Sequence, residues 1–250
     1  MLPTLDCHAH LDPSLSPGEF SSSGAVLAMS ISLAEAEKSL ERQDPFIVWG
    51  VGCHPRLLRY QEAFDPDIFQ QYAEKALIIG EVGLDTGSRV PLETQLTTFR
   101  QVLRTAATLR KIISIHSCQA IALVLCELQK CPIDFPVMHG WSGNVAETKL
   151  AVEMGCYFSI HSQVARNSKF RLHVPSDRIL VESDHGYNDP PAAIPCRVGW
   201  VEYLVAQQYQ LDVTELRRLV WRNFSRIVHG SGIFSKLSAP MQVYIQEVEN

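Results

Sequence analysis

Six residues of metal-binding type stand at the ends of short apolar runs: His8, His10, Glu81, His116, His139 and Asp184. His8 and His10 are two residues apart, and alternate residues of an extended chain point to the same side, so both imidazoles can face one ion. Imidazole with carboxylate and no thiolate suits zinc, manganese or iron, or magnesium held mostly through oxygen. Six ligands are too many for one tetrahedral zinc. They suit two divalent ions (Mg²⁺, Mn²⁺ or Zn²⁺) about 3.5–4 Å apart, the spacing used to hydrolyse phosphate esters.

Each of these residues has a simpler explanation when it is taken alone. A lone histidine near a strand end is usually just hydrogen-bonded, and Glu81 could be a buried carboxylate paired with an arginine. Ionisable side chains, however, are rarely buried without partners. Six of them at strand ends in one register need partners, and metal ions supply partners for all six.

The elements that must position these residues are short β-type runs that alternate with helix-type stretches. The runs are rich in branched aliphatic residues and apolar on consecutive positions, as in strands that a parallel sheet buries on both faces. The predicted strands are 4–7, 26–30, 46–51, 77–81, 112–116, 135–139, 156–160 and 179–182. The predicted helices are 33–42, 66–76, 91–110, 120–130, 144–154, 164–172, 196–209 and 214–229.

Eight strand–helix pairs in 250 residues predict an α/β fold, a (β/α)₈ TIM barrel that forms a single domain over residues 1–250. A doubly wound open sheet is the alternative, but it ordinarily has a glycine-rich first loop, and DCHAHLD is not one. The nearest candidates for a linker, 16–24 and 187–195, have the composition of loops. In a TIM barrel the functional groups lie at the carboxyl ends of the strands, so the six candidates should meet at one mouth.

The composition excludes several classes of protein. A net charge of −5 argues against a protein that holds duplex nucleic acid mainly by charge, so any such contact must be local. No run of about 18 apolar residues occurs, which argues against a transmembrane helix, and MLPTLDCHAH is unlike a secretory signal. The seven cysteines are scattered, with no CxxC pair. They indicate free, mostly buried thiols in a reducing compartment, and the expected location is the cytoplasm.

Several motifs occur in a fixed order: DxHxHLD from Asp6, GxHP, IGExGLD, a histidine after an apolar strand, HGWSG and LVESD. Together they resemble the TatD family of metal-dependent deoxyribonucleases, within the amidohydrolase-like barrels. The resemblance spans the chain from Asp6 to about Ile227. It implies a (β/α)₈ barrel with a two-metal site and DNase activity.

The resemblance also implies a role for each candidate residue. His8 and His10 match ligands of the first metal, His116 and His139 match ligands of the second, and Glu81 matches the carboxylate that bridges them. Asp184 matches the aspartate that binds metal and orients or deprotonates the attacking water. His54 matches a histidine near the scissile phosphate.

The chain departs from the family pattern at positions expected to touch substrate. Arg56 stands where a second histidine usually follows GxHP, and Cys118 where an arginine usually follows the fifth strand. Arg56 could supply the missing charge, because a guanidinium grips phosphate with a planar fork, or it could form a surface salt bridge. Arg166, Lys169, Arg171 and His173 could line a path for phosphate, although a solvated charged face is the simpler explanation.

The leading hypothesis is therefore a nuclease-type phosphodiesterase in which Asp184 and Glu81 are catalytic and His54 and Arg56 bind the phosphate. An acidic protein with a compact mouth should prefer DNA ends or single strands, and RNA is a further possible substrate. One alternative is a hydrolase of C–N or lactone bonds, although many binuclear enzymes of that group use a carboxylated lysine, and neither Lys75 nor Lys111 falls at a strand end. Another is a non-catalytic scaffold barrel, against which the complete set of six ligands argues. The sequence identifies no protein partner and no membrane contact.

Overall fold

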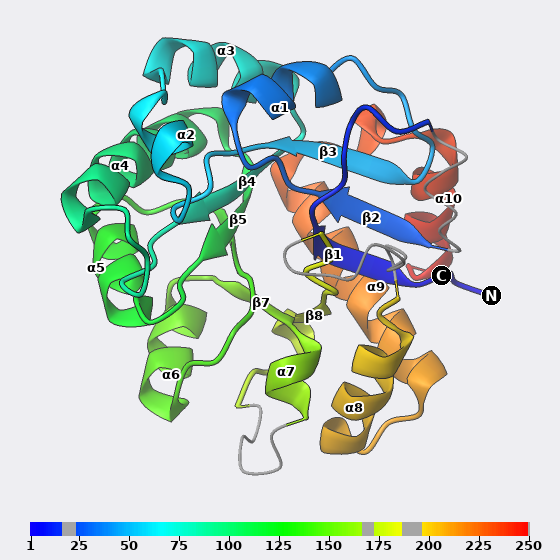
Figure 1. Cartoon of the computed structure of the whole chain (residues 1–250). Coiled ribbons are helices and arrows are strands. Elements are labelled where there is room, and N and C mark those ends of the chain that lie inside the picture. Colours follow the sequence, from blue (N-terminus) through cyan, green and yellow to red (C-terminus); the bar gives the residue numbers. More distant parts are fainter. Residues whose placement is uncertain (17–23, 167–172, 187–196, 250) are drawn as a thin grey trace.

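An eight-stranded parallel sheet forms the centre of the computed structural model, which describes residues 1–16, 24–166, 173–186 and 197–249 (Figure 1). The strands follow one another in chain order: β1 (Leu5–Ala9), β2 (Ala25–Ala28), β3 (Ile47–Val51), β4 (Ile78–Gly83), β5 (Ile112–His116), β6 (Phe135–Met138), β7 (Tyr157–Ile160) and β8 (Ile179–Val181). Nearly every strand residue is buried, which explains the continuous apolar runs in the sequence.

The first and last strands lie side by side and close the sheet into a barrel. Where these two strands end, the backbone N–H of Asp184 donates to the carbonyl of His8 at 3.0 Å, and that of His10 donates to the carbonyl of His185. The predicted (β/α)₈ barrel is therefore confirmed, and the open doubly wound sheet is excluded.

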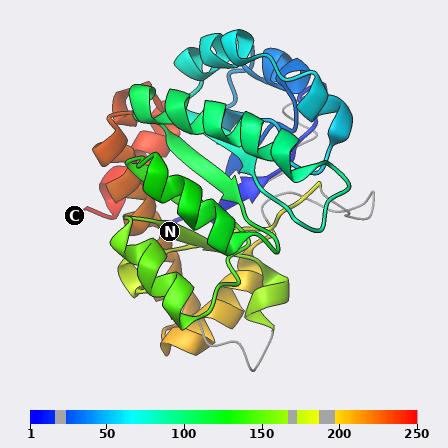
Figure 2. The same ribbon diagram turned by 90° about the vertical axis from the view of Figure 1, so that its left-hand side faces the viewer.

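Helices cover the outside of the sheet, as Figures 1 and 2 show from two sides. They are α1 (Leu33–Ser39), α2 (Leu58–Glu62), α3 (Pro66–Lys75), α4 (Leu92–Leu109), α5 (Ile121–Lys130), α6 (Val145–Glu153), α7 (Ser162–Ala165), α8 (Gly199–Tyr209), α9 (Val213–Ser231) and α10 (Ala239–Glu247). The two longest helices, α4 and α9, begin at a proline and at a side-chain cap. In α9, for example, Asp212 and Glu215 form a reciprocal capping box. The helix-spaced stripe of α4 from Leu96 to Ala106 is buried against the sheet.

Several predicted boundaries need correction. β1 extends two residues beyond its predicted end, because Ala9 pairs with Ala28 and bridges to His185, so His8 lies inside the strand. The seventh helix was predicted at 164–172. The structure instead begins α7 at Ser162, where the His161 side chain accepts from the backbone of Gln163, and ends it at Ala165. Residues 167–172 and most of the two predicted loops, 16–24 and 187–195, lie outside the described residues.

The structure also tests the expectations of buried free thiols and of no transmembrane helix. The six described cysteines are free thiols, but only Cys7, Cys53 and Cys156 are buried, so the expectation of mostly buried thiols holds for half of them. Within the described part of the chain, every helix is too short or too polar to serve as a transmembrane span.

Candidate metal centre

The six predicted metal-binding residues meet at the carboxyl ends of the strands. His8 lies in β1 and His10 just after it, Glu81 lies in β4, and His116 ends β5. His139 follows β6 and Asp184 follows β8. Five of these residues are buried, whereas the Asp184 side chain remains 26% exposed. Asp184 is therefore the member of the set that is most open to solvent.

Glu81 stands at the centre of the cluster and uses its two oxygens differently. Oε1 lies 2.5 Å from Nδ1 of His116 and 2.8 Å from Nε2 of His139. Oε2 lies 2.9 Å from Nε2 of His10 and 3.5 Å from Nε2 of His8. Asp184 Oδ1 lies 3.8 Å from the same His10 nitrogen and 3.9 Å from that of His8. One carboxylate thus faces two separate pairs of imidazoles, and Asp184 adjoins only one pair.

Three of the histidines contact a hydrogen-bond acceptor on the ring nitrogen that faces away from Glu81. His10 Nδ1 lies 3.0 Å from the Met29 carbonyl, His116 Nε2 lies 3.1 Å from Asp85 Oδ2, and His139 Nδ1 lies 3.5 Å from Glu182 Oε1. In a neutral ring the proton belongs on that outer nitrogen, so the inner nitrogen presents a lone pair to the Glu81 carboxylate. Lone pair and carboxylate repel unless a proton or a metal cation lies between them. This is the arrangement of metal-binding histidines that are oriented by outer acceptors.

The buried polar atoms also fit a cation. His8 Nε2 and Glu81 Oε2 make no well-aligned hydrogen bond among the described residues, although both atoms are buried. An unsatisfied buried polar atom costs free energy, and a cation held between these atoms removes that cost. The residues present therefore fit divalent metal ions at this mouth.

The surrounding charges keep Glu81 ionised. Burial alone would raise its pKa, but the positive potential of His139 and His116 and a hydrogen bond from His10 outweigh burial and hold the pKa well below its usual value. For His139, burial acts to lower the pKa, yet the carboxylates of Glu81 and Glu182 raise it well above its usual value. The centre thus carries an ionised carboxylate at neutral pH, as cation binding requires.

His54 is also part of the cluster, but the ring nitrogen that faces Glu81 is a hydrogen-bond donor. It is 1% exposed, its Nε2 lies 3.3 Å from Glu81 Oε2, and burial lowers its pKa to about 3, so the ring is neutral. Its Nδ1 accepts the backbone N–H of Arg56 at 3.1 Å, which places the ring proton on Nε2. His54 therefore presents a donor to the mouth, whereas His10, His116 and His139 in their neutral forms present lone pairs.

Arg56 adopts one of the two arrangements expected of it. Its Nε lies 3.5 Å from Asp85 Oδ2, and its side chain is 41% exposed. The salt bridge is therefore present, and part of the guanidinium still faces solvent beside the mouth. Asp85 thus contacts both Arg56 and the ring of His116. Of the other basic residues, Arg166 is exposed at the end of α7, and Lys169 and Arg171 lie outside the described residues.

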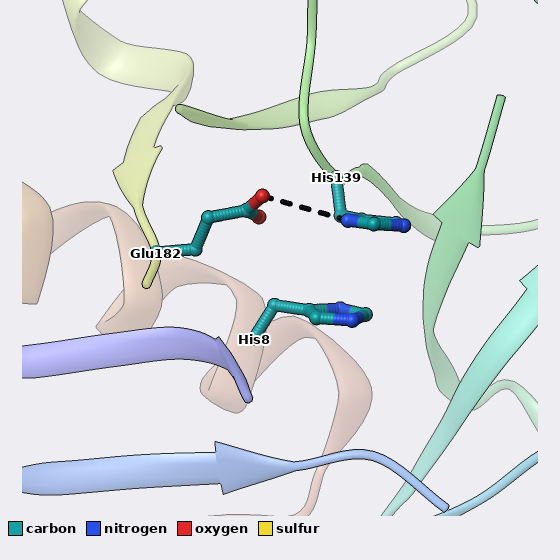
Figure 3. A group of neighbouring side chains, drawn as sticks. All are labelled: His8, His139 and Glu182. Atoms are coloured by element: carbon teal, nitrogen blue, oxygen red, sulfur yellow. Dashed lines mark hydrogen bonds and ion pairs between the residues drawn. The ribbon is translucent and has the colours of Figure 1, made fainter. Parts of the chain in front are cut away.

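Glu182 was not among the predicted site residues, although it belongs to the LVESD motif that carries Asp184. It is fully buried, and its Oε1 accepts the backbone N–H of Gly140 at 2.9 Å while facing His139. Figure 3 shows this carboxylate pointing at the His139 ring, which stacks on His8 with ring centroids 3.9 Å apart and an interplanar angle of 9°. A carboxylate at the end of the last strand was the available sequence signal. Its contacts indicate that Glu182 orients His139.

We expect the substitution Glu182→Gln to weaken metal binding roughly 10- to 100-fold, the usual cost of losing the outer partner of a metal-binding histidine. The amide keeps the shape of the side chain but removes the charge that holds the proton on His139 Nδ1. The affinity is measured by competition with a metal-sensitive chelator. Glu153→Gln, an exposed site on α6, is the matched control. Equal affinity in wild type and Glu182→Gln would assign this carboxylate a purely structural role.

Known proteins resemble this chain over nearly its whole length. A family model described as TatD related DNase matches residues 5–229. The putative deoxyribonuclease TATDN3 of Mus musculus is 25% identical over 275 residues, covering 97% of this chain and 92% of its own. YcfH of Escherichia coli K12, named an uncharacterized metal-dependent hydrolase, is 25% identical over 198 residues, covering 73% of this chain and 74% of its own.

A solved structure of a TatD homolog has a similar fold. The crystal structure of YjjV, a TatD homolog from Escherichia coli K12, superposes with a TM-score of 0.77 at 20% identity, covering 90% of this chain and 97% of that one. The likeness in fold agrees with the family match and with the convergence of histidines and carboxylates at the barrel mouth. The chain belongs to the TatD related DNase family of metal-dependent hydrolases.

Proposed function

We propose that this protein is a two-metal phosphodiesterase that cleaves DNA. In this proposal His8, His10, Glu81 and Asp184 hold one divalent ion, and Glu81, His116 and His139 hold the other, with Mg²⁺, Mn²⁺ or Zn²⁺ as candidates. The observation that carries the proposal is the placement of Glu81, whose two oxygens face two different pairs of imidazoles. A carboxylate so placed suits a bridge between paired ions, the arrangement used for hydrolysis of phosphate esters.

Asp184 is the proposed general base. Bound divalent cations supply Lewis acidity, which draws charge from the phosphoryl group and acidifies water. Asp184 is the most exposed of the six residues and lies beside His8 and His10, so its carboxylate can accept the proton of the attacking water. The largely buried imidazoles cannot reach solvent in this way.

His54 and Arg56 are the proposed phosphate contacts. The proton on His54 Nε2 points into the mouth and can be donated to a phosphate oxygen. Arg56 can offer its exposed N–H groups while Asp85 holds one side of the guanidinium. Both residues then stabilise negative charge that develops on the phosphate during attack.

The proposed substrate is DNA at ends or in single-stranded regions, with RNA as a further candidate. Several relatives are named deoxyribonucleases, and the net charge of −5 does not favour charge-driven binding of a long duplex. We further propose that residues 1–250 form one catalytic domain. The free thiols of the exposed Cys118 and Cys126 favour a reducing, cytoplasmic setting.

The main rival is hydrolysis of a C–N or lactone bond. Enzymes of that kind often carry a carboxylated lysine between their metals. Here Lys111 Nζ donates to the carbonyl of Ala76, at the amino ends of the strands and away from the mouth. Glu81 occupies the bridging position instead, which favours the phosphodiesterase.

A panel of substrates tests the proposal. The purified protein is given single-stranded DNA, duplex DNA with blunt or recessed ends, RNA, nucleotides and amide or lactone compounds, each with Mg²⁺, Mn²⁺ or Zn²⁺. We expect metal-dependent cleavage of single-stranded or end-bearing DNA, abolished by a chelator. The proposal would be overturned if the protein hydrolysed an amide or lactone and no phosphodiester. Turnover of no substrate would favour a scaffold barrel.

We expect the substitution Arg56→Ala to raise KM for DNA by roughly 5- to 20-fold, the effect of losing one partly exposed charged hydrogen bond, with a smaller change in kcat. The slope of log(kcat/KM) against log salt concentration should also decrease by about 1, because one phosphate contact is lost. Arg104→Ala, an exposed arginine on α4, is the matched control. An unchanged KM and salt slope would leave Arg56 with the Asp85 salt bridge alone.

A further inference from the structure

Two aromatic side chains stack on each other on the outer surface of α8. Trp200 is 51% exposed and Tyr203 is 44% exposed, and no other Trp, Tyr or Phe among the described residues is exposed to this extent. Their ring centroids lie 5.3 Å apart with an interplanar angle of 18°. Large aromatic rings normally contribute to a core or an interface, so a stacked pair held in solvent needs an explanation.

The fold of α8 does not depend on these two rings. The opposite side of the helix packs against the rest of the protein through Val201, Val205 and Ala206. Glu202 adds a two-bonded ion pair with Arg217, at 2.6 and 2.9 Å. The aromatic pair is thus available for a ligand.

The pair lies toward the catalytic face of the barrel. β8 ends beside Asp184, and the helix that follows a barrel strand starts on that face and runs back toward the amino ends of the strands. The far end of α8 confirms this direction, because the hydroxyl of Tyr209 donates to the carbonyl of Val174, which precedes β8. Trp200 and Tyr203 occupy the first turns of α8, at the end that starts from the mouth.

Two exposed arginines lie on the segments that adjoin the aromatic pair in sequence or in packing. Arg197 is exposed three residues before Trp200, and Arg166 is exposed at the end of α7, which packs against α8 in both views (Figures 1 and 2). Exposed aromatic faces beside basic side chains are what proteins use to hold single-stranded nucleic acid, since every base has a face that can stack and every link carries a phosphate.

A second copy of this chain fits the pair less well. A stable dimer buries about 800 Å² on each partner. The other strongly exposed apolar side chains, including Leu58, Leu123 and Val243, lie on α2, α5 and α10, so they do not extend the aromatic pair into a broad patch. The exposed area of Trp200 and Tyr203 fits a single flat ring, such as a nucleic-acid base, better than a protein interface.

We propose that Trp200 and Tyr203 form a stacking platform for an unpaired base of the nucleic acid, with Arg197 and Arg166 contacting the flanking phosphates. The platform holds a single strand that leads into the metal centre. This inference rests on the proposed nuclease function and adds to it a base-binding site outside the phosphate contacts.

Tryptophan fluorescence tests the platform directly, because Trp49, Trp141 and Trp221 are buried and Trp200 is not. The protein, residues 1–250, is titrated in the presence of Mg²⁺ with a short oligo(dT) whose phosphorothioate links resist cleavage. We expect quenching in wild type, little quenching in Trp200→Phe, and no quenching by an abasic oligomer with the same number of phosphates. The Kd from fluorescence anisotropy should increase by roughly 5- to 150-fold in the double variant Trp200→Ala/Tyr203→Ala. It should recover in part in Trp200→Phe and stay at the wild-type value in the control Val243→Ala.

The platform is wrong if the abasic oligomer binds as tightly as oligo(dT) or if the double variant keeps the wild-type Kd. It is also wrong if wild type sediments as a dimer that the double variant loses, since the pair would then be an interface between copies. A second substrate separates this inference from the proposed function. Hydrolysis of bis-p-nitrophenyl phosphate needs no base on α8. If oligo(dT) quenches Trp200 but no phosphodiester is hydrolysed, the nuclease proposal is refuted and the stacking platform stands. If a phosphodiester is hydrolysed but oligo(dT) causes no quenching, the platform is refuted and the nuclease proposal stands.

Discussion

Substitution of Glu81 by glutamine is expected to deplete metal from both halves of the centre at once. Each Glu81 oxygen faces a different pair of imidazoles, and a neutral amide is a poor bridging ligand. Loss of an outer partner alone costs 10- to 100-fold in metal affinity, so loss of the shared charge should cost more than about 100-fold at both positions. Hydrolysis of DNA should then fall by more than the roughly 10²–10⁴ that a lost general base costs.

Metal analysis of the purified variant or anomalous scattering from its crystals measures this effect. His8→Ala is the informative comparison, because its ring faces only one Glu81 oxygen and the variant should lose mainly one ion. Glu127→Gln, which replaces a buried carboxylate bonded to Arg100, controls for removal of a buried charge. Full occupancy by two ions in Glu81→Gln would refute the bridging assignment.

The substitution Asp184→Asn should leave the fold and at least one ion in place but lower kcat on a short single-stranded DNA by roughly 10²–10⁴. Asp184 has a φ of 51°, in the left-handed region, which asparagine tolerates as well as aspartate does. The change therefore removes a proton acceptor and a negative charge without new backbone strain. Glu81, His116 and His139 are untouched and can still hold one ion.

His54→Ala provides the contrast, measured at saturating Mg²⁺ or Mn²⁺ with the metal content of each variant determined. His54 presents a donor in place of a lone pair, so its loss should leave the metal content unchanged and reduce kcat less than Asp184→Asn does. Near-normal hydrolysis by Asp184→Asn would mean that another group activates the water.

The meeting of the six residues at one mouth could be predicted because it depends only on topology. In a parallel barrel the carboxyl ends of all strands share one face, so a histidine or carboxylate at each strand end is enough to place them together. Strand ends could be predicted less well. β4 continues to Gly83, because Val82 and Gly83 pair with β5, so Glu81 lies within the strand and not at its end.

The features that sequence reasoning missed depend on side-chain orientation or on weak periodicity. The proton position on His54 follows from one backbone N–H, and the role of Glu182 follows from the direction in which its carboxylate points. Neither is encoded in residue spacing. α10 was also missed, although Ser238 and the nearby Pro240 are a recognisable helix start, because its apolar residues lack a clear helical stripe.

The seam between β1 and β8 has a consequence for the order in which the protein matures. Asp6 accepts the backbone N–H of Ser183, 177 residues further along the chain, and His8, His10 and Asp184 meet across the same seam. A ribosome delivers β1 first and β8 last among the strands, so the pocket shared by these three residues cannot form until residue 184 of the 250 has been synthesised. Glu81, His116 and His139 all precede residue 140, so they are synthesised well before Asp184. An ion bound across the seam stabilises the closed barrel by its own binding free energy, so the nascent chain gains a complete catalytic centre only when its last strand has docked.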